Sequence, residues 1–176
     1  MDERERARVR AAIDAAEGRG GVPPASYGQL RHLLAGSRTI AVVGASPKPD
    51  RPSHGVLLAL KAAGWHIIPV NPASQALADG VAGLPCYPNL ASAAASLPEG
   101  QRIDLVDVFR RSEDCADVTR EAIAAGAGAI WLQLGIISPE AAALAAEADI
   151  PFVQDRCTAI EVQRLRVSGP SAERTS

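Results

Sequence analysis

The chain has 176 residues, of which 47% are hydrophobic and 22% are charged, and its net charge is −2. This composition predicts one globular domain rather than a disordered chain, and the near-neutral charge gives no electrostatic basis for binding nucleic acid or an anionic membrane. With only two Trp, two Tyr and two Phe, the chain also lacks the aromatic side chains of a base-stacking platform.

The cysteine pattern indicates reduced thiols. Cys86, Cys115 and Cys157 are odd in number and far apart, so neither a disulfide framework nor a zinc site is predicted, and we expect no metal. The N-terminus is charged, without the apolar region of a signal peptide. No apolar run approaches the ~18–20 residues that span a bilayer. We therefore expect a cytoplasmic protein with no membrane contact.

The residue pattern of the N-terminal part predicts helices. Residues 2–17 carry apolar side chains at helical spacing, and glycines and prolines at 18–24 end that pattern. A short helix is expected over 27–34, with Ser26 as its N-cap and Gly36 at its end. We interpret residues 1–36 as a helical extension of the main domain.

From residue 39 onward, strands and helices alternate. The clear strands are short apolar runs at 39–43, 66–70, 102–109, 129–134 and 150–155, and 83–90 is a weaker strand or an extended segment. Helices are predicted at 55–65, 73–79, 91–96, 112–126, 138–148 and 157–165. Three of these have N-terminal signals, with Ser53 or His54 near the first start and Ser112 and Ser138 as N-caps.

This alternation predicts an α/β fold, a doubly wound parallel sheet of five to six strands with helices on both faces. The domain would span 37–167, and 168–176 would be a disordered tail. In such sheets, ligands bind beyond the carboxyl ends of the strands where the strand order reverses. The candidate site is therefore built from the loops that follow the strong strands.

Those loops suit a ligand with several phosphates. Lys48 and Arg51 lie in the first loop, and Arg110 and Arg111 follow the fourth predicted strand. Of the two adjacent arginines, we expect Arg110 to face the groove. Four of the loops run into a helix start, where free backbone N–H groups and the helix dipole favour anions.

The usual nucleotide motifs do not match. A dinucleotide fingerprint needs G-x-G-x-x-G and an acid about 20 residues later. Here only Gly44 of that pattern is present, and Asn71 follows the second strand where the acid would stand. Lys48 lacks the preceding glycine of a phosphate-binding P-loop. NAD and ATP in their usual modes are therefore disfavoured, and the proline-rich loop leaves room for a bulkier phosphate ligand.

The segments VVGASPKPDRPSHGV, IIPVNP, DLVDVFRRSED, AIWLQLGI and DRCTAIE closely resemble the bacterial CoA-binding proteins of the YccU-like group. The domain of these proteins is similar to the CoA-binding domain of the succinyl-CoA synthetase α subunit. The resemblance spans roughly residues 31–165. It implies a Rossmann-like domain that binds coenzyme A or an acyl-CoA.

The resemblance also implies which residues bind the cofactor. Gly44, Ala45, Ser46 and Lys48 would contact its nucleotide and phosphates, and Asn71 and Pro72 would line the adenosine side. The diphosphate and pantetheine path would be bordered by Val108, Phe109 and Arg110, and the groove would continue past Gln133, Leu134 and Gly135. From the first loop we add Arg51, and also His54, which could meet a phosphate or cap the helix.

Cys157 is the candidate reactive residue. It is expected at a helix N-terminus beside Arg156, and both features favour a thiolate. A mixed disulfide with the CoA thiol is chemically feasible, although a free cysteine is more often a small buried hydrophobe. We interpret Asp107 and Glu161 as structural, the latter paired with Arg156 or Arg164.

Three functions stay open from the sequence. The first is a stand-alone CoA-binding module without chemistry of its own, because no catalytic set is recognised. The second is an enzyme or redox protein that acts on a CoA thiol, thioester or disulfide through Cys157. The third is a regulatory subunit that docks through the N-terminal helix, which is also compatible with a homodimer.

Overall fold

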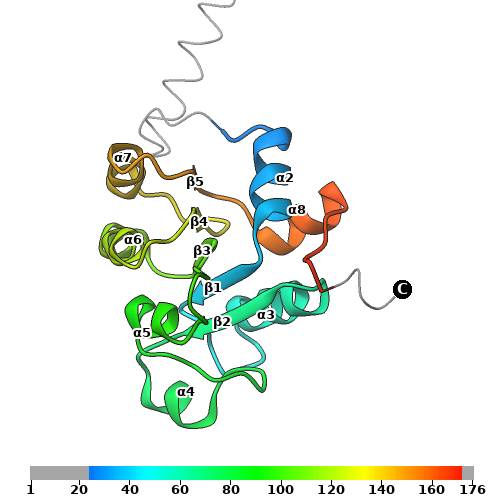
Figure 1. The fold of residues 1–176 in the computed structure, drawn as a ribbon, viewed down its shortest axis with the longest axis vertical. Coiled ribbons are helices and arrows are strands. Elements are labelled where there is room, and N and C mark those ends of the chain that lie inside the picture. Colours follow the sequence, from blue (N-terminus) through cyan, green and yellow to red (C-terminus); the bar gives the residue numbers. More distant parts are fainter. Residues whose placement is uncertain (1–23, 172–176) are drawn as a thin grey trace, which may run out of the picture.

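The computed structural model describes residues 24–171. The helix predicted at 2–17 and the last residues of the predicted tail, 172–176, lie outside this range. The described chain forms one five-stranded sheet in which every neighbouring pair is parallel (Figure 1). Its strands are β1 (Thr39–Val43), β2 (His66–Val70), β3 (Leu105–Val108), β4 (Ile130–Leu132) and β5 (Phe152–Val153).

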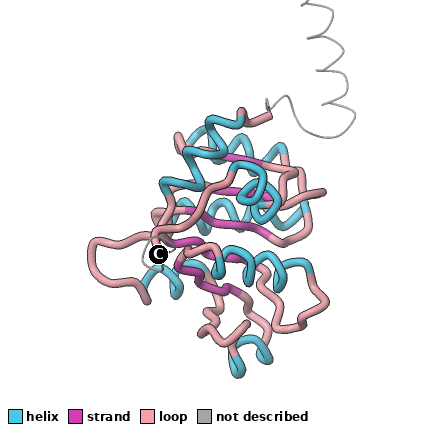
Figure 2. The backbone as a smooth tube through the Cα atoms, turned by 90° about the vertical axis from the view of Figure 1, so that its right-hand side faces the viewer, coloured by secondary structure: helices cyan, strands magenta, loops and turns pink. Residues whose placement is uncertain are grey.

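The strand order is β2-β1-β3-β4-β5, so the chain leaves β1 first to one side and later to the other. The reversal falls between β1 and β3, whose carboxyl ends therefore diverge into loops on opposite sides of the sheet. Figure 2 shows the strands stacked one beside another with helices before and behind them. The expected doubly wound parallel fold is confirmed.

Helices cover both faces of the sheet (Figure 1). On one face, α2 (Tyr27–Gly36), α3 (Pro52–Ala62) and α8 (Thr158–Leu165) pack around Val42 and Trp131. The other face is covered by α5 (Leu90–Ala95), α6 (Cys115–Ala124) and α7 (Pro139–Glu147), which pack against Val106 and Ile130. The short α4 (Ser74–Asp79) follows β2. All five positions of β1 are buried, as its unbroken apolar run predicted.

The weak strand expected at 83–90 is absent. The segment makes only isolated bridges, between Tyr87 and Val70 and between Leu84 and Val81. Pro85 and Pro88 lack the N–H groups that a continuous ladder needs, so the segment remains extended beside β2.

Two helix starts differ from the prediction. The helix expected from residue 55 begins at Pro52, because a proline fits the first helical position, where no intrahelical N–H bond is required. Ser112 is not an N-cap: it opens a short 3₁₀ turn, Ser112–Asp114, and its Oγ accepts a bond from Ile137 N–H instead. Ser26 and Ser138 cap α2 and α7 as predicted.

Both ends of the described chain pack against the domain. Leu30 and Leu34 of α2 are fully buried in the same core as β1, so this helix is a layer of the domain rather than an appendage. At the other end, Gly169 and Ser171 donate backbone hydrogen bonds to the carbonyls of Ala63 and Gly64. The chain is therefore anchored as far as Ser171, beyond the point where the tail was expected to begin. No helix within residues 24–171 combines the length and apolarity needed to cross a membrane.

Candidate functional site

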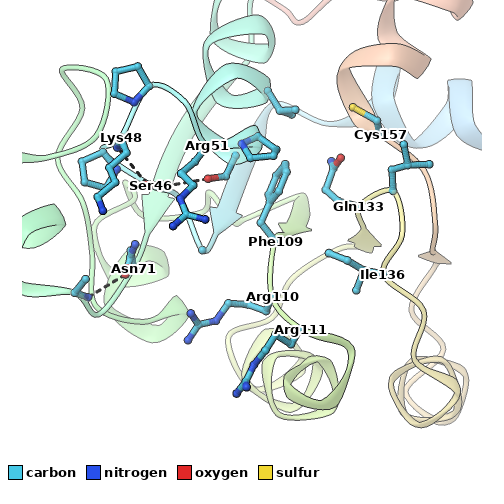
Figure 3. Close-up of a pocket in the computed structure, with 18 of the residues that line it drawn as sticks. Ser46, Lys48, Arg51, Asn71, Phe109, Arg110, Arg111, Gln133, Ile136 and Cys157 are labelled. Atoms are coloured by element: carbon cyan, nitrogen blue, oxygen red, sulfur yellow. Dashed lines mark hydrogen bonds between the residues drawn. The ribbon is translucent and has the colours of Figure 1, made fainter.

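A cavity of about 1350 Å³ opens at the carboxyl ends of the strands, where the strand order reverses. It is lined by the loops after β1, β2, β3 and β4 and by the first residues of α3 and α8. Figure 3 shows Lys48 and Arg51 on one side, Gln133, Ile136 and Cys157 on the other, and Phe109 between them. This is the place that the strand-end loops predicted.

The floor of the cavity is the contact between the loops after β1 and β3. Phe109 N–H donates to Val43 O at 2.8 Å, and Gly44 N–H donates to Val70 O at 2.9 Å. Gly44 has a φ of +82°, and a Cβ there would lie 2.2 Å from Phe109 O. Only glycine allows the two loops to meet this closely.

Polar bonds within the first loop hold its shape. Ser46 N–H donates to Ser53 Oγ at 3.0 Å, and Lys48 N–H donates to Ser46 Oγ at 3.2 Å. The Ser46 carbonyl lies 2.8 Å from His54 Nδ1. Since a carbonyl only accepts, Nδ1 carries the proton. His54 is buried and does not line the cavity. Its side chain bonds the first loop and not the start of α3. The geometry therefore supports neither of the two predicted roles, contact with a phosphate or helix capping, and indicates that His54 braces the loop.

Asn71 braces the same loop from β2. Its Nδ2 donates to Ala45 O at 2.7 Å, and its Oδ1 accepts from Ala73 N–H at 2.9 Å. The residue that replaces the ribose-binding acid therefore joins two loops while it lines the cavity. Asn71 is half-buried, and both the NH₂ group and the oxygen of its amide are hydrogen-bonded. Such an amide fixes the relative position of the loops that it connects.

Three cations on the cavity wall have no ion-pair partner among residues 24–171: Lys48, Arg51 and Arg110. The Arg110 side chain passes directly over Gly44, where a Cβ would be 3.2 Å from its Cδ. Arg111 also reaches the cavity, but its guanidinium pairs with Glu113 and Asp114. Both arginines thus line the cavity, and they differ in that the charge of Arg111 is already paired.

Behind the inner wall lies a buried polar cluster of Asp107, Gln133 and Thr158. Gln133 Nε2 donates to Asp107 Oδ1 at 2.6 Å and to Thr158 Oγ1 at 2.8 Å, and the Thr158 hydroxyl donates to Asp107 Oδ2 at 2.8 Å. Burial raises the pKa of Asp107 to about 7, and the bonds from Gln133 and Thr158 oppose that rise. Asp107 thus has partners, as its predicted structural role required.

Cys157 is the N-cap residue of α8 and lines the cavity, as predicted. Its neighbour Arg156 is directed to Glu161, with a separation of 3.2 Å, and Glu161 also pairs with Arg164 at 2.9 Å. The sequence predicts that the Arg156 charge favours the Cys157 thiolate, but this charge is paired with Glu161. The structural reading of Glu161 is supported by both ion pairs.

The predicted binding residues divide into two groups. Nine line the cavity: Gly44, Ser46, Lys48, Arg51, Asn71, Phe109, Arg110, Gln133 and Leu134. Five do not: Ala45, His54, Pro72, Val108 and Gly135. Ala45 and Val108 are fully buried in the two hydrophobic cores, because their side chains point into the layers beside the sheet.

Several lining residues were not in the predicted set. They include Pro47 and Pro49 of the first loop, Pro52 at the start of α3, the α4 residues Gln75 and Asp79, and the apolar residues Val56, Ile136 and Ile160. The prolines were visible as part of the first loop. Ile160 could have been found from its place one turn after Cys157, since neighbouring residues of a first helical turn can face the same side.

The comparisons with known proteins agree with this geometry. A model of the CoA-binding domain matches residues 38–163, and the chain belongs to this family of CoA-binding domains. It is 38% identical to the uncharacterized protein YneT of Bacillus subtilis over 133 residues, which cover 75% of this chain and 90% of YneT.

Solved structures from two thermophiles are also similar. A Thermus thermophilus protein is 35% identical with a TM-score of 0.70, and the match covers 80% of this chain and 99% of that one. A hypothetical protein of Pyrococcus horikoshii is 32% identical with a TM-score of 0.72, and covers 83% and 98% of the two chains. The CoA-binding family and the Rossmann-like fold predicted from the strand-end loops are thus both confirmed.

Proposed function

We propose that this protein binds coenzyme A or an acyl-CoA in the cavity at the carboxyl ends of its strands, as a stand-alone binding or regulatory module. The observation that carries the proposal is a set of three cations on the wall of one cavity, Lys48, Arg51 and Arg110, which have no ion-pair partner among the described residues 24–171. CoA carries a diphosphate and a 3′-phosphate, so a charged nucleotide end would lie against these cations.

The cavity lining also includes apolar side chains. Leu134 and Ile160 are exposed, and Ile136 and Val56 line the cavity as well. Ile136 lies on the side opposite Lys48 and Arg51 (Figure 3). A pantetheine arm, or an acyl group attached to it, would cover this apolar surface and gain from its burial. A lining that combines cations with apolar side chains therefore supports a ligand with a phosphorylated head and a largely uncharged arm.

A second candidate function rests on Cys157. Its position on the cavity lining supports a role in which the cysteine exchanges with a CoA disulfide. The Cys157 thiolate would attack one sulfur of CoA disulfide, forming the protein–CoA disulfide and releasing CoA thiolate, which takes up a proton from water. This reaction would make the protein a redox-responsive CoA carrier.

The predicted docking and homodimer roles of the N-terminal helix concern residues outside the described range. Deletion of residues 1–24 tests both, because loss of a docking element changes oligomer size or the set of co-purifying proteins. An unchanged elution volume and an unchanged set of proteins would count against both roles.

Thermal unfolding with CoA, acetyl-CoA, NAD, NADP and ATP tests the main proposal. A ligand at about 100 times its Kd stabilises the folded state by roughly 2.7 kcal/mol. For a chain of this size that is a rise in Tm of roughly 5–10 °C. We expect this rise with CoA or acetyl-CoA. Stabilisation by NAD with none by either CoA compound would overturn the proposal.

A further inference from the structure

The buried cluster behind the cavity wall fixes the orientation of one amide. Asp107 lies within β3, Gln133 follows β4, and Thr158 is the first residue of α8. All three are buried, with exposed fractions of 0%, 2% and 0%. The cluster therefore joins three elements of the chain at the point where the cavity begins.

In the structure each hydrogen bond of this cluster has a defined direction. Gln133 Nε2 has two hydrogens, and one is donated to Asp107 Oδ1 and the other to Thr158 Oγ1. The single hydroxyl hydrogen of Thr158 goes to Asp107 Oδ2. When Asp107 is ionised, above its pKa of about 7, a turned-over Gln133 amide would place its oxygen against the carboxylate and be repelled, so this orientation is the favoured one there.

This orientation leaves the Gln133 carbonyl oxygen, Oε1, without a donor from any residue in the range 24–171. Gln133 lines the cavity, and its side chain lies between Phe109 and Cys157 in Figure 3. A buried acceptor without a hydrogen bond costs about 1–3 kcal/mol. A bound molecule that donates to Oε1 recovers this cost, and one that presents an oxygen there does not.

We propose that Gln133 Oε1 accepts a hydrogen bond from a secondary amide N–H in the uncharged arm of the ligand, so that the inner end of the cavity selects an amide-bearing thiol arm. This inference rests on the proposed binding of CoA, whose pantetheine arm contains two such amides. The cations on the cavity wall select phosphates, and Gln133 adds a requirement that a bare nucleotide does not meet.

The position of Gln133 also relates the arm to Cys157. In CoA an ethylene group separates the last amide nitrogen from the sulfur. With that N–H held at Gln133, the sulfur would lie within a few bonds of Gln133, and Cys157 lies on the same side of the cavity as Gln133 (Figure 3). Asp107 and Thr158 are positioning residues, because they act on the ligand only through the amide of Gln133.

The test compares three ligands by titration calorimetry with the full chain. They are CoA, a CoA analogue with an ester oxygen in place of the last amide N–H, and adenosine 3′,5′-bisphosphate, which has no arm. The native protein is expected to bind the ester analogue about tenfold more weakly than CoA, because an ester oxygen faces Oε1 without a proton.

The matched variant is Gln133→Met, which keeps the length of the side chain and removes the acceptor. It is expected to bind CoA about tenfold more weakly than the native protein, to lose the preference for CoA over the ester analogue, and to bind adenosine 3′,5′-bisphosphate unchanged. Thr158→Val keeps Gln133 but removes one of the two acceptors of its Nε2, so it is expected to weaken CoA binding and leave bisphosphate binding unchanged.

The possible failures are distinct. If the native protein binds CoA and the ester analogue equally, the role of Gln133 is wrong while CoA binding stands. If the native protein binds none of the three ligands, the proposed function itself is wrong. If Gln133→Met also loses bisphosphate binding, the variant has disturbed the fold, and the comparison of CoA with its ester analogue on the native protein decides the question.

Discussion

Gly44 and Phe109 come from different loops, and a Cβ on Gly44 would lie 2.2 Å from the Phe109 carbonyl oxygen. The two loops follow β1 and β3, the strands between which the sheet reverses its order. This contact closes the floor of the cavity and carries the Arg110 side chain across it. The shape of the proposed binding site therefore depends on the absence of a single methyl group.

Replacing Gly44 with alanine is expected to destabilise the fold and abolish ligand binding. The positive φ alone costs about 1–2 kcal/mol for a residue with a Cβ, and the contact with Phe109 forces the β3 loop to move as well. Gly135→Ala is the matched control, since Gly135 has the same φ of +82° but its Cβ would meet nothing within 4 Å. Urea unfolding of both variants isolates the cost of the contact, and equal losses of stability would show that it is negligible.

Removing one of the three cavity cations that lack an ion-pair partner within residues 24–171 is expected to weaken CoA binding roughly 10- to 100-fold, since a charge-assisted hydrogen bond contributes roughly 1.5–3 kcal/mol. The variants are Lys48→Met, Arg51→Met and Arg110→Met, measured by titration calorimetry at low and high salt. The control is Arg120→Met, which changes the net charge equally but removes a guanidinium paired with Asp117 and Glu140 outside the cavity. An equal loss of affinity in the control would mean that only overall charge matters.

The pKa of Asp107 predicts a fall in stability as the pH rises. An aspartate ordinarily titrates near 3.8, and in the folded protein burial raises the pKa of Asp107 to about 7. Between these values the folded state holds a proton that the unfolded state has lost, so the free energy of unfolding decreases with rising pH. The decrease is complete above pH 7 and is on the order of 4 kcal/mol.

Asp107→Asn removes this titration, because the amide carries no charge. Its oxygen can accept from Gln133 Nε2, and its Nδ2 can donate to the Thr158 hydroxyl, so that this bond reverses its direction. The variant is expected to show a flatter dependence of stability on pH, measured by urea unfolding at about pH 4.5 and about pH 8. The exposed Asp50→Asn makes the same change in charge and should retain the native slope. If the stability of the Asp107 variant depended on pH as steeply as that of the native protein, Asp107 would not be the group responsible.

Treatment with CoA disulfide is expected to modify Cys157 in preference to the other two cysteines. Cys157 lines the cavity, whereas Cys86 and Cys115 do not. Burial raises the pKa of Cys86, and burial with the nearby Asp114 and Glu113 raises the pKa of Cys115 to about 11. Both are therefore weak nucleophiles at neutral pH.

Intact mass followed by peptide mapping measures this modification, with Cys157→Ser as the negative control. Adenosine 3′,5′-bisphosphate in excess should slow the reaction if CoA disulfide enters through the nucleotide site. An adduct that persists at the same rate in Cys157→Ser would refute the role of Cys157.

Much of the fold was predictable from local patterns. The apolar run at 39–43 and the strong helix signals at Ser26 and Ser138 correspond to β1 and to the capped helices α2 and α7. Some differences have local reasons, such as the proline that starts α3 at residue 52. Others lie where a tertiary contact outweighed local preference. Ser112 has the sequence of an N-cap, yet its hydroxyl accepts from Ile137 in the next loop, a contact that no local rule contains.

Periodicity, glycines and charges are local properties, so the alternation of strands and helices, the place of the site at the strand ends and the cations available there were all predictable from the sequence. The folded chain was needed to learn which of those residues share the cavity, that Asn71 and His54 brace the first loop, and that Asp107 and Thr158 orient Gln133. These relationships join residues as far as 51 positions apart. The direction of a buried hydrogen bond depends on partners that only the packing of the sheet brings together.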